Sequence, residues 1–185
     1  MLLKISRFFS AMAKGWLILV LLAIFIPYLL TTAPVLKTVP GGNITSLDAQ
    51  VFYTPQQAFS TIASYGSSIP YWVRIHLTWD LINPLMYTLL LSVAISWLLH
   101  RGFRPESRAA VFNLLPLAAG LSDILENLAI VVLLSVYPAK PVAVAIFGTL
   151  FSTLKMTFFG LSVIMLLVAA ARAALNRFRR IEGWG

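Results

Sequence analysis

The sequence predicts an all-α integral membrane protein, a four-helix bundle that forms one domain over residues 1–185. The chain is 59% hydrophobic and 11% charged, whereas soluble domains carry about 25% charged residues. Four stretches are long and apolar enough to cross a hydrocarbon core of about 30 Å, which takes about 20 helical residues. Basic residues gather at one end of each predicted span, as they do in membrane proteins with a fixed orientation.

The predicted segments follow one another without a second domain. They are a basic interfacial leader (1–14), a first span (15–32), an outer loop of about 40 residues (33–70), three further spans (71–99, 109–137 and 142–174) and a basic cytoplasmic tail (175–185). In the leader, Ile5, Phe8, Phe9 and Met12 follow the spacing of an amphipathic helix at a membrane surface. We interpret the first span as a retained helix, because its apolar core is long for a signal peptide and Pro34 would hinder cleavage.

The outer loop has its own turn and helix signals. The stretch "VPGGN" at 39–43 predicts a turn. Thr54 followed by Pro55 predicts the start of a short helix over 55–65, which Gly66 would end.

Lysine and arginine set the predicted orientation, since cytoplasmic ends retain them. With the N-terminus inside, the cytoplasmic set is Lys4, Arg7, Lys14, Arg101, Arg104, Arg108, Arg172, Arg177, Arg179 and Arg180. The outer set is Lys37, Arg74 and Lys140. We therefore expect both termini in the cytoplasm and a location in the bacterial inner (plasma) membrane. The net charge of +8 is explained by this orientation and by contact with anionic lipids, so no nucleic-acid partner is expected.

Composition also limits the chemistry. The chain has no cysteine and two histidines, which excludes disulfides and thiolate metal sites and argues against a His-rich metal centre. We expect neither a metal nor a cofactor.

The last three predicted spans carry ionisable residues, each of which costs roughly 2.5–3.5 kcal/mol at the centre of a membrane helix. They are Asp80, Asp123, Glu126 and Lys155. At about 1.5 Å per residue, Asp80 lies near the outer boundary, Asp123 and Glu126 lie in the outer half, and Lys155 lies near mid-depth. Residues on three helices are therefore expected to meet in one polar site.

Spacing supports this convergence, because the polar residues of each span share one helical face. The candidate site residues are His76, Asp80, Asn83 and Tyr87 on the second span, Asp123, Glu126 and Asn127 on the third, and Lys155 on the fourth. Gly148 and Ser152 share the face of Lys155 and allow a close approach of helices. We expect Lys155 to pair with one carboxylate, and at least one other acid to hold a proton near neutral pH.

Pro84 lies within the second span and removes the helical hydrogen bond to the carbonyl of Asp80. Two outcomes are open. The carbonyl and the nearby carboxylate can together face a ligand, cation or water, or a neighbouring side chain can satisfy the carbonyl as at other proline kinks.

These residues resemble a widespread family of small four-span membrane proteins. The resemblance is carried by Tyr65-Gly66, Asp80-x-x-x-Pro84-x-x-Tyr87, Pro116, Asp123-x-x-Glu126-Asn127, Tyr137-Pro138 and Thr153-x-Lys155. It implies the four-span fold and no activity. The chain departs from the family pattern at Ser67 and Ser68, where similar proteins often carry Gly-Arg. The acidic four-helix arrangement is also more distantly similar to emopamil-binding-type sterol isomerases, but no motif allows residues to be transferred.

Two functional hypotheses remain open at this stage. In the first, the polar site binds, modifies or transports a lipophilic or cationic small molecule, and its carboxylates act as ligands or move protons. In the second, the protein is a non-catalytic accessory subunit of a larger membrane complex, and the polar residues only fix the register of the helices. The expected partners are membrane lipids, such a small molecule, and other membrane subunits.

Overall fold

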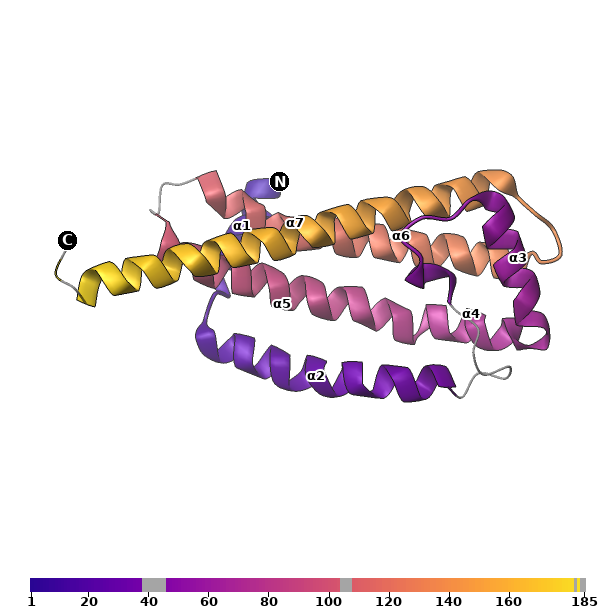
Figure 1. Ribbon diagram of the computed structural model, residues 1–185, viewed down its shortest axis with the longest axis horizontal. Coiled ribbons are helices and arrows are strands. Elements are labelled where there is room, and N and C mark those ends of the chain that lie inside the picture. The colour runs from indigo at the N-terminus through magenta and orange to yellow at the C-terminus, as the bar shows by residue number, and fades with distance from the viewer. Residues whose placement is uncertain (38–45, 104–107, 182, 184–185) are drawn as a thin grey trace.

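A computed structural model describes residues 1–37, 46–103, 108–181 and 183, and the predicted turn at 39–43 lies outside these residues. The described chain is helical, and no strand occurs in the described ranges (Figure 1). The α-helices are α1 (Leu2–Ala11), α2 (Gly15–Lys37), α3 (Pro55–Tyr65), α4 (Ile69–Leu77), α5 (Trp79–Gly102), α6 (Leu115–Ser135) and α7 (Val142–Ile181). Short 3-10 helices are η1 (Leu47–Ala49), η2 (Gly66–Ser68) and η3 (Arg108–Leu114).

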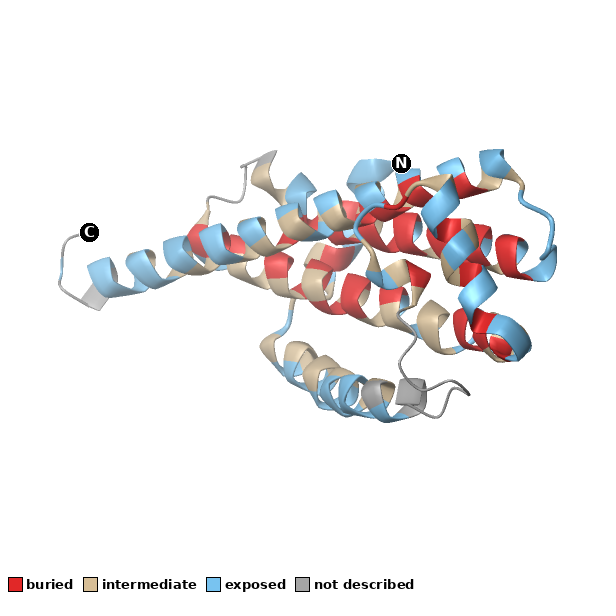
Figure 2. Cartoon of the chain, turned by 45° about the vertical axis from the view of Figure 1, so that its right-hand side comes forward, coloured by how far each residue is buried: buried red, intermediate tan, exposed pale blue. Residues whose placement is uncertain are grey.

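Four helical stretches are long and apolar enough to cross a membrane, as the sequence predicts. They are Gly15–Thr32, Pro55–Gly102, Ala109–Ser135 and Val142–Arg179. Helices α5, α6 and α7 lie side by side, and α2 runs along α5 (Figure 1). In the apolar window of α6, 56% of the residues are buried, against 6% in α2. Helix α6 is therefore the centre of the bundle, and α2 is its most exposed member (Figure 2).

The two ends of the bundle differ. At one end, called here the loop end, η1, α3 and α4 fold onto α6 and α7. At the other end, called here the basic end, α1 packs on η3, and α7 continues past its neighbours (Figure 1). Ser6 of α1 donates a hydrogen bond to the carbonyl of Ala110 at 3.0 Å, and Asn113 donates to the carbonyl of Ser6 at 2.9 Å.

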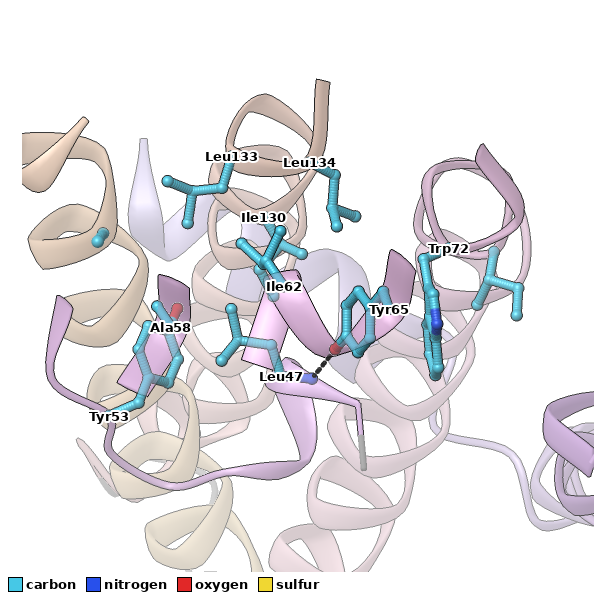
Figure 3. Packing of buried hydrophobic residues seen from close by; sticks show 11 residues of the cluster. Leu47, Tyr53, Ala58, Ile62, Tyr65, Trp72, Ile130, Leu133 and Leu134 are labelled. Carbon is cyan, nitrogen blue, oxygen red and sulfur yellow. Dashed lines mark hydrogen bonds between the residues drawn. The ribbon is translucent and has the colours of Figure 1, made fainter. Parts of the chain in front are cut away.

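An aromatic core fixes the loop end (Figure 3). Tyr65 stacks on Trp72 with ring centroids 4.7 Å apart, and the Tyr65 hydroxyl accepts a hydrogen bond from the backbone N–H of Leu47 at 3.0 Å. All three side chains are nearly or completely buried. Burial of large apolar side chains stabilises by about 1.5–3 kcal/mol each, so this core holds η1 and α3 firmly against α6.

Helix α3 has the bounds of the predicted short helix. The Thr54 hydroxyl accepts from the N–H of Gln57 at 3.2 Å, and the Gln57 side chain accepts from the N–H of Thr54 at 2.7 Å, which makes a capping box. Gly66 ends the helix with φ of +52°, a conformation that residues with a Cβ rarely adopt.

The range 71–99, predicted as one span, is divided by the structure at Thr78 into α4 and α5. Thr78 has φ −122° and ψ −75°, and its hydroxyl donates to the carbonyl of Arg74 at 2.7 Å. A threonine hydroxyl bonded in this way competes with the helical backbone and bends it. The break lies between His76 and Asp80, which still contact each other across it.

Candidate functional site

A cluster of ionisable and polar side chains lies at the loop end, between α4, α5, α6, α7 and η1. We call it the polar cluster, and its members are Asp48, His76, Asp80, Tyr87, Asp123, Glu126, Asn127 and Lys155. Every predicted site residue except Asn83 takes part. Asn83 is half-buried, and its side chain forms none of the hydrogen bonds found among the described residues.

Lys155 is the central cation of the polar cluster. Its Nζ lies 2.5 Å from Glu126 Oε2 and 3.6 Å from Asp123 Oδ1, and it donates to the carbonyl of Asp48 at 3.1 Å. The Glu126 side chain is fully buried, and those of Lys155 and Asp123 are 9% and 8% exposed. The lysine therefore pairs with two carboxylates, one more than the sequence predicts.

Asn127 determines which of the two outcomes at Pro84 occurs. Its Nδ2 donates to the carbonyl of Asp80 at 3.1 Å, which is the carbonyl that the proline leaves without a helical partner. The same Nδ2 lies 3.4 Å from Asp123 Oδ1. The second of the two outcomes described above is the one observed, because a side chain of the neighbouring helix satisfies the freed carbonyl.

His76 links α4 to this network. Its Nδ1 lies 2.8 Å from Asp80 Oδ2 and 3.1 Å from Asn127 Oδ1. Both of these oxygens accept, so Nδ1 carries the proton and donates to them. The side chain is completely buried, and Nε2 has no hydrogen-bond partner among the described residues.

Tyr87 closes the network on the side of α5. Its hydroxyl donates to Asp123 Oδ2 at 3.2 Å, and its ring meets the edge of Phe159 with centroids 5.4 Å apart. A continuous chain of contacts thus runs from His76 through Asn127 and Asp123 to Lys155 and Glu126.

Residues 46–53, which include η1, lie across the polar cluster, and we call them the covering segment. Side chains of α7 at successive turns hold its backbone. Lys155 binds the carbonyl of Asp48, the Ser152 hydroxyl donates to the carbonyl of Gln50 at 2.7 Å, and the N–H of Tyr53 donates to Thr149 Oγ1 at 3.1 Å. The covering segment therefore runs antiparallel to α7. The polar face predicted on the fourth span anchors this segment as well.

The lack of a side chain at Gly148 leaves room for the Tyr53 hydroxyl. A Cβ at position 148 would lie 2.5 Å from the Tyr53 hydroxyl, too close for any side chain. The phenol is completely buried. Burial and the nearby charge of Glu126 raise the pKa of Tyr53 well above its usual range, so the hydroxyl keeps its proton.

Asp48 is the functional candidate that the sequence reasoning missed. It lies outside the predicted spans, so neither helical spacing nor depth pointed to it. One signal was present, since Asp48 is the single acidic residue between 33 and 70. In the structure the covering segment brings its carboxylate to His76 and Asp80, and Ser46 donates a hydrogen bond to that carboxylate.

The polar cluster is rich in negative charge. Asp48, Asp80, Asp123 and Glu126 face one lysine and one histidine. Asp48, His76 and Asp80 each offer a ligand atom, and these atoms lie within 4.8 Å of one another. Two carboxylates and an imidazole are a donor set that fits a divalent cation. These three residues could hold a metal ion through an imidazole nitrogen of His76 that carries no proton.

Comparisons with protein-family models, with curated proteins and with solved structures gave no match for this chain.

Proposed function

We propose that the protein is an integral membrane protein whose polar cluster binds a small lipophilic or cationic molecule. In this proposal four helical stretches cross the bilayer, both termini lie in the cytoplasm, and the loop end faces outward. The proposal includes membership of the four-span family and a location in the bacterial inner membrane. The four apolar stretches and the excess of basic residues at the basic end support the topology.

The binding proposal rests on the buried carboxylate of Glu126, which lacks a hydrogen-bond donor. Oε2 forms an ion pair with Lys155, and both carboxylate oxygens are buried without a hydrogen-bond partner among the described residues. Isolated buried charge is costly, and a carboxylate oxygen left without a donor calls for a proton or a cation. A protonated amine supplies both the charge and the hydrogen-bond donor.

The balance of charge favours the same ligand class. With four carboxylates, one lysine and one protonated histidine, the polar cluster would still carry two uncompensated negative charges. A cationic group neutralises part of this excess, and an apolar tail can leave the cluster toward the lipid, because the surrounding helices expose apolar side chains such as Ile146 and Phe147.

The proposal includes an entry route from the outer side. Asp80 is 18% exposed, and Asp48 is partly exposed, whereas Glu126 is fully buried. A cation from the outer side therefore meets Asp48 and Asp80 first. It reaches Glu126 when the covering segment moves away from Ser152 and Lys155.

Native mass spectrometry of the detergent-extracted protein tests this proposal. We expect a small cationic molecule to stay bound to the wild type and to be lost from the Glu126→Gln variant, which keeps the shape of the side chain and removes its charge. Asn83→Ala is the matched control, because Asn83 is a polar residue of α5 outside the cluster. Wild-type protein that neither retains such a molecule nor takes up added N,N-dimethyldodecylamine would refute the proposal.

An accessory role is the second candidate, and two observations favour it. The side chains of the polar cluster largely satisfy one another, and one face of α7 presents aromatic rings, including Phe147 and Phe151 at 4.5 Å. Such a face can dock on another membrane subunit. A stoichiometric protein partner that is retained by the wild type and lost when Phe147 is replaced by Ala would favour this role.

A further inference from the structure

A groove at the basic end lies between the last turns of α5 and the C-terminal part of α7. Its volume is about 890 Å³. It is lined by aromatic, apolar and basic side chains of α5 and α7, among them Trp97 and Arg101 of α5 and Arg177 and Phe178 of α7. The groove is at the opposite end of the bundle from the polar cluster, so the proposal for that cluster does not account for it.

Two arginines supply the charge of the groove. The guanidinium of Arg101 lies 3.6 Å from the centroid of the Trp97 ring and donates one hydrogen bond to the carbonyl of Trp97 at 3.2 Å. A guanidinium carries five N–H donors, so most of those on Arg101 have no hydrogen-bond partner among the described residues. Arg177 is exposed on the α7 side. Arginine pairs bind phosphate oxygens with fork geometry, better than a single point charge.

The floor of the groove is apolar. Ala170, Ala173 and Ala174 follow the i, i+3, i+4 spacing, so their methyl groups share one face of α7. Leu98 and the Trp97 ring lie on the α5 side, and Phe178, which is 62% exposed, lies beyond the alanines. An acyl chain is the kind of ligand that fits small apolar side chains between two aromatic ones.

The two helices hold the groove in shape. The side chain of Asn176 donates to the carbonyls of Arg101 at 3.2 Å and Gly102 at 3.1 Å. A Cβ on Gly102 would lie 3.1 Å from the backbone nitrogen of Ala173, which shows how closely the helices approach. The groove is therefore formed before any ligand arrives.

Charge is strongly separated along the molecule. The four acids among the described residues, Asp48, Asp80, Asp123 and Glu126, all lie in the polar cluster at the loop end. Arg101, Arg172 and Arg177 lie at the basic end. An anion in the groove thus meets positive charge and no carboxylate of the described residues.

We propose that this groove binds an anionic phospholipid of the bilayer, with its phosphate on Arg101 and Arg177 and one acyl chain along the alanine face of α7. The combination of guanidinium groups with an apolar floor selects a phospholipid over a free phosphate, which would leave the floor empty. The proposal rests on the membrane location argued above and is independent of the ligand of the polar cluster.

Native mass spectrometry of the full chain in detergent tests this site. The probes are phosphatidylglycerol and phosphatidylcholine with identical acyl chains. We expect phosphatidylglycerol to bind the wild type more tightly than phosphatidylcholine. The variants Arg101→Gln and Arg177→Gln should each weaken binding of phosphatidylglycerol about fivefold, since one basic side chain near anionic lipid contributes on this scale. Arg179→Gln is the matched control, an exposed arginine of α7 outside the groove lining, and should bind as the wild type does.

Ala174→Leu provides a second test that leaves every charge in place. Ala174 is exposed in the groove, so the substitution is compatible with folding and fills the floor. We expect it to weaken phosphatidylglycerol binding, whereas inorganic phosphate at millimolar concentration should not displace the lipid. Equal binding of the two lipids, equal loss in Arg179→Gln, unchanged binding in Ala174→Leu, or displacement by phosphate would each overturn the proposal.

Discussion

Lys155 Nζ and Glu126 Oε2 lie 2.5 Å apart in a place where the glutamate side chain has no exposure to solvent. This pair joins α6 to α7 and, through the bond from Lys155 to the carbonyl of Asp48, joins both helices to the covering segment. The same contacts therefore stabilise the loop end and leave negative charge uncompensated within it.

Removing Lys155 should be strongly destabilising. The variant Lys155→Met leaves Glu126 and Asp123 buried without their cation, and breaking a buried pair on one side costs about 3–5 kcal/mol. Chemical unfolding in detergent micelles measures this change. The double variant Lys155→Met/Glu126→Met should recover part of the loss, because it removes the stranded carboxylate as well. If the double variant loses more unfolding free energy than the two single variants lose in sum, the pairing is contradicted.

Asn127 and Pro84 should be energetically coupled. The variant Asn127→Leu leaves the Asp80 carbonyl without a partner, at a cost of about 1–3 kcal/mol. In a Pro84→Ala background, residue 84 has an N–H that can bond that carbonyl, so the same asparagine substitution should cost less. A double-mutant cycle on unfolding free energies measures this coupling. Equal costs in the two backgrounds would show that Asn127 does not act on the carbonyl that Pro84 frees.

Gly148 should tolerate a side chain only when the Tyr53 hydroxyl is absent. The variant Gly148→Ala places a Cβ at 2.5 Å from that hydroxyl, and such overpacking typically costs about 1–3 kcal/mol. The double variant Gly148→Ala/Tyr53→Phe should be more stable than Gly148→Ala. Thermal unfolding provides the comparison, with Gly160→Ala as control, because a Cβ there meets nothing within 4 Å. If Tyr53→Phe does not restore the stability lost in Gly148→Ala, the steric conflict involves a group other than the Tyr53 hydroxyl.

Ser152 should act locally on the covering segment. The variant Ser152→Ala removes the hydrogen bond to the Gln50 carbonyl, which contributes about 1 kcal/mol. Hydrogen exchange should then speed up in residues 46–53 while the centre of α6 keeps its protection. Ser135→Ala is the matched control, since among the described residues Ser135 bonds within its own helix, to the carbonyl of Val131. Unchanged exchange in residues 46–53 would argue against α7 as the anchor of the covering segment.

Much of the fold could be predicted because the length of an apolar stretch and the spacing of polar residues along a helix are local properties of the sequence. The apolar stretches defined the four long helices, and the i, i+4, i+7 spacing placed Asp123, Glu126 and Lys155 on faces that meet. The capping signals at Thr54 and Gly66 likewise depend on residues that are neighbours in sequence.

The remaining features depend on tertiary contacts. The apolar pattern of residues 71–99 favours one continuous helix, whereas the structure breaks this helix at Thr78. Asp48 reaches the polar cluster only because an aromatic core around Tyr65 and Trp72 folds its segment onto α6. Asn83 has the same helical spacing as His76 and Tyr87, and spacing alone could not show that its side chain stays outside the network.

Binding of a cationic molecule by the polar cluster is tested most directly by an equilibrium titration. N,N-dimethyldodecylamine is titrated into wild-type protein and the Glu126→Gln variant in the same neutral detergent, and dodecanol serves as the uncharged control. We expect saturable binding of the amine to the wild type, binding weaker by about tenfold or more in the variant, and no competition by dodecanol. Equal affinity of the amine for both proteins, or equal binding of dodecanol, would contradict it.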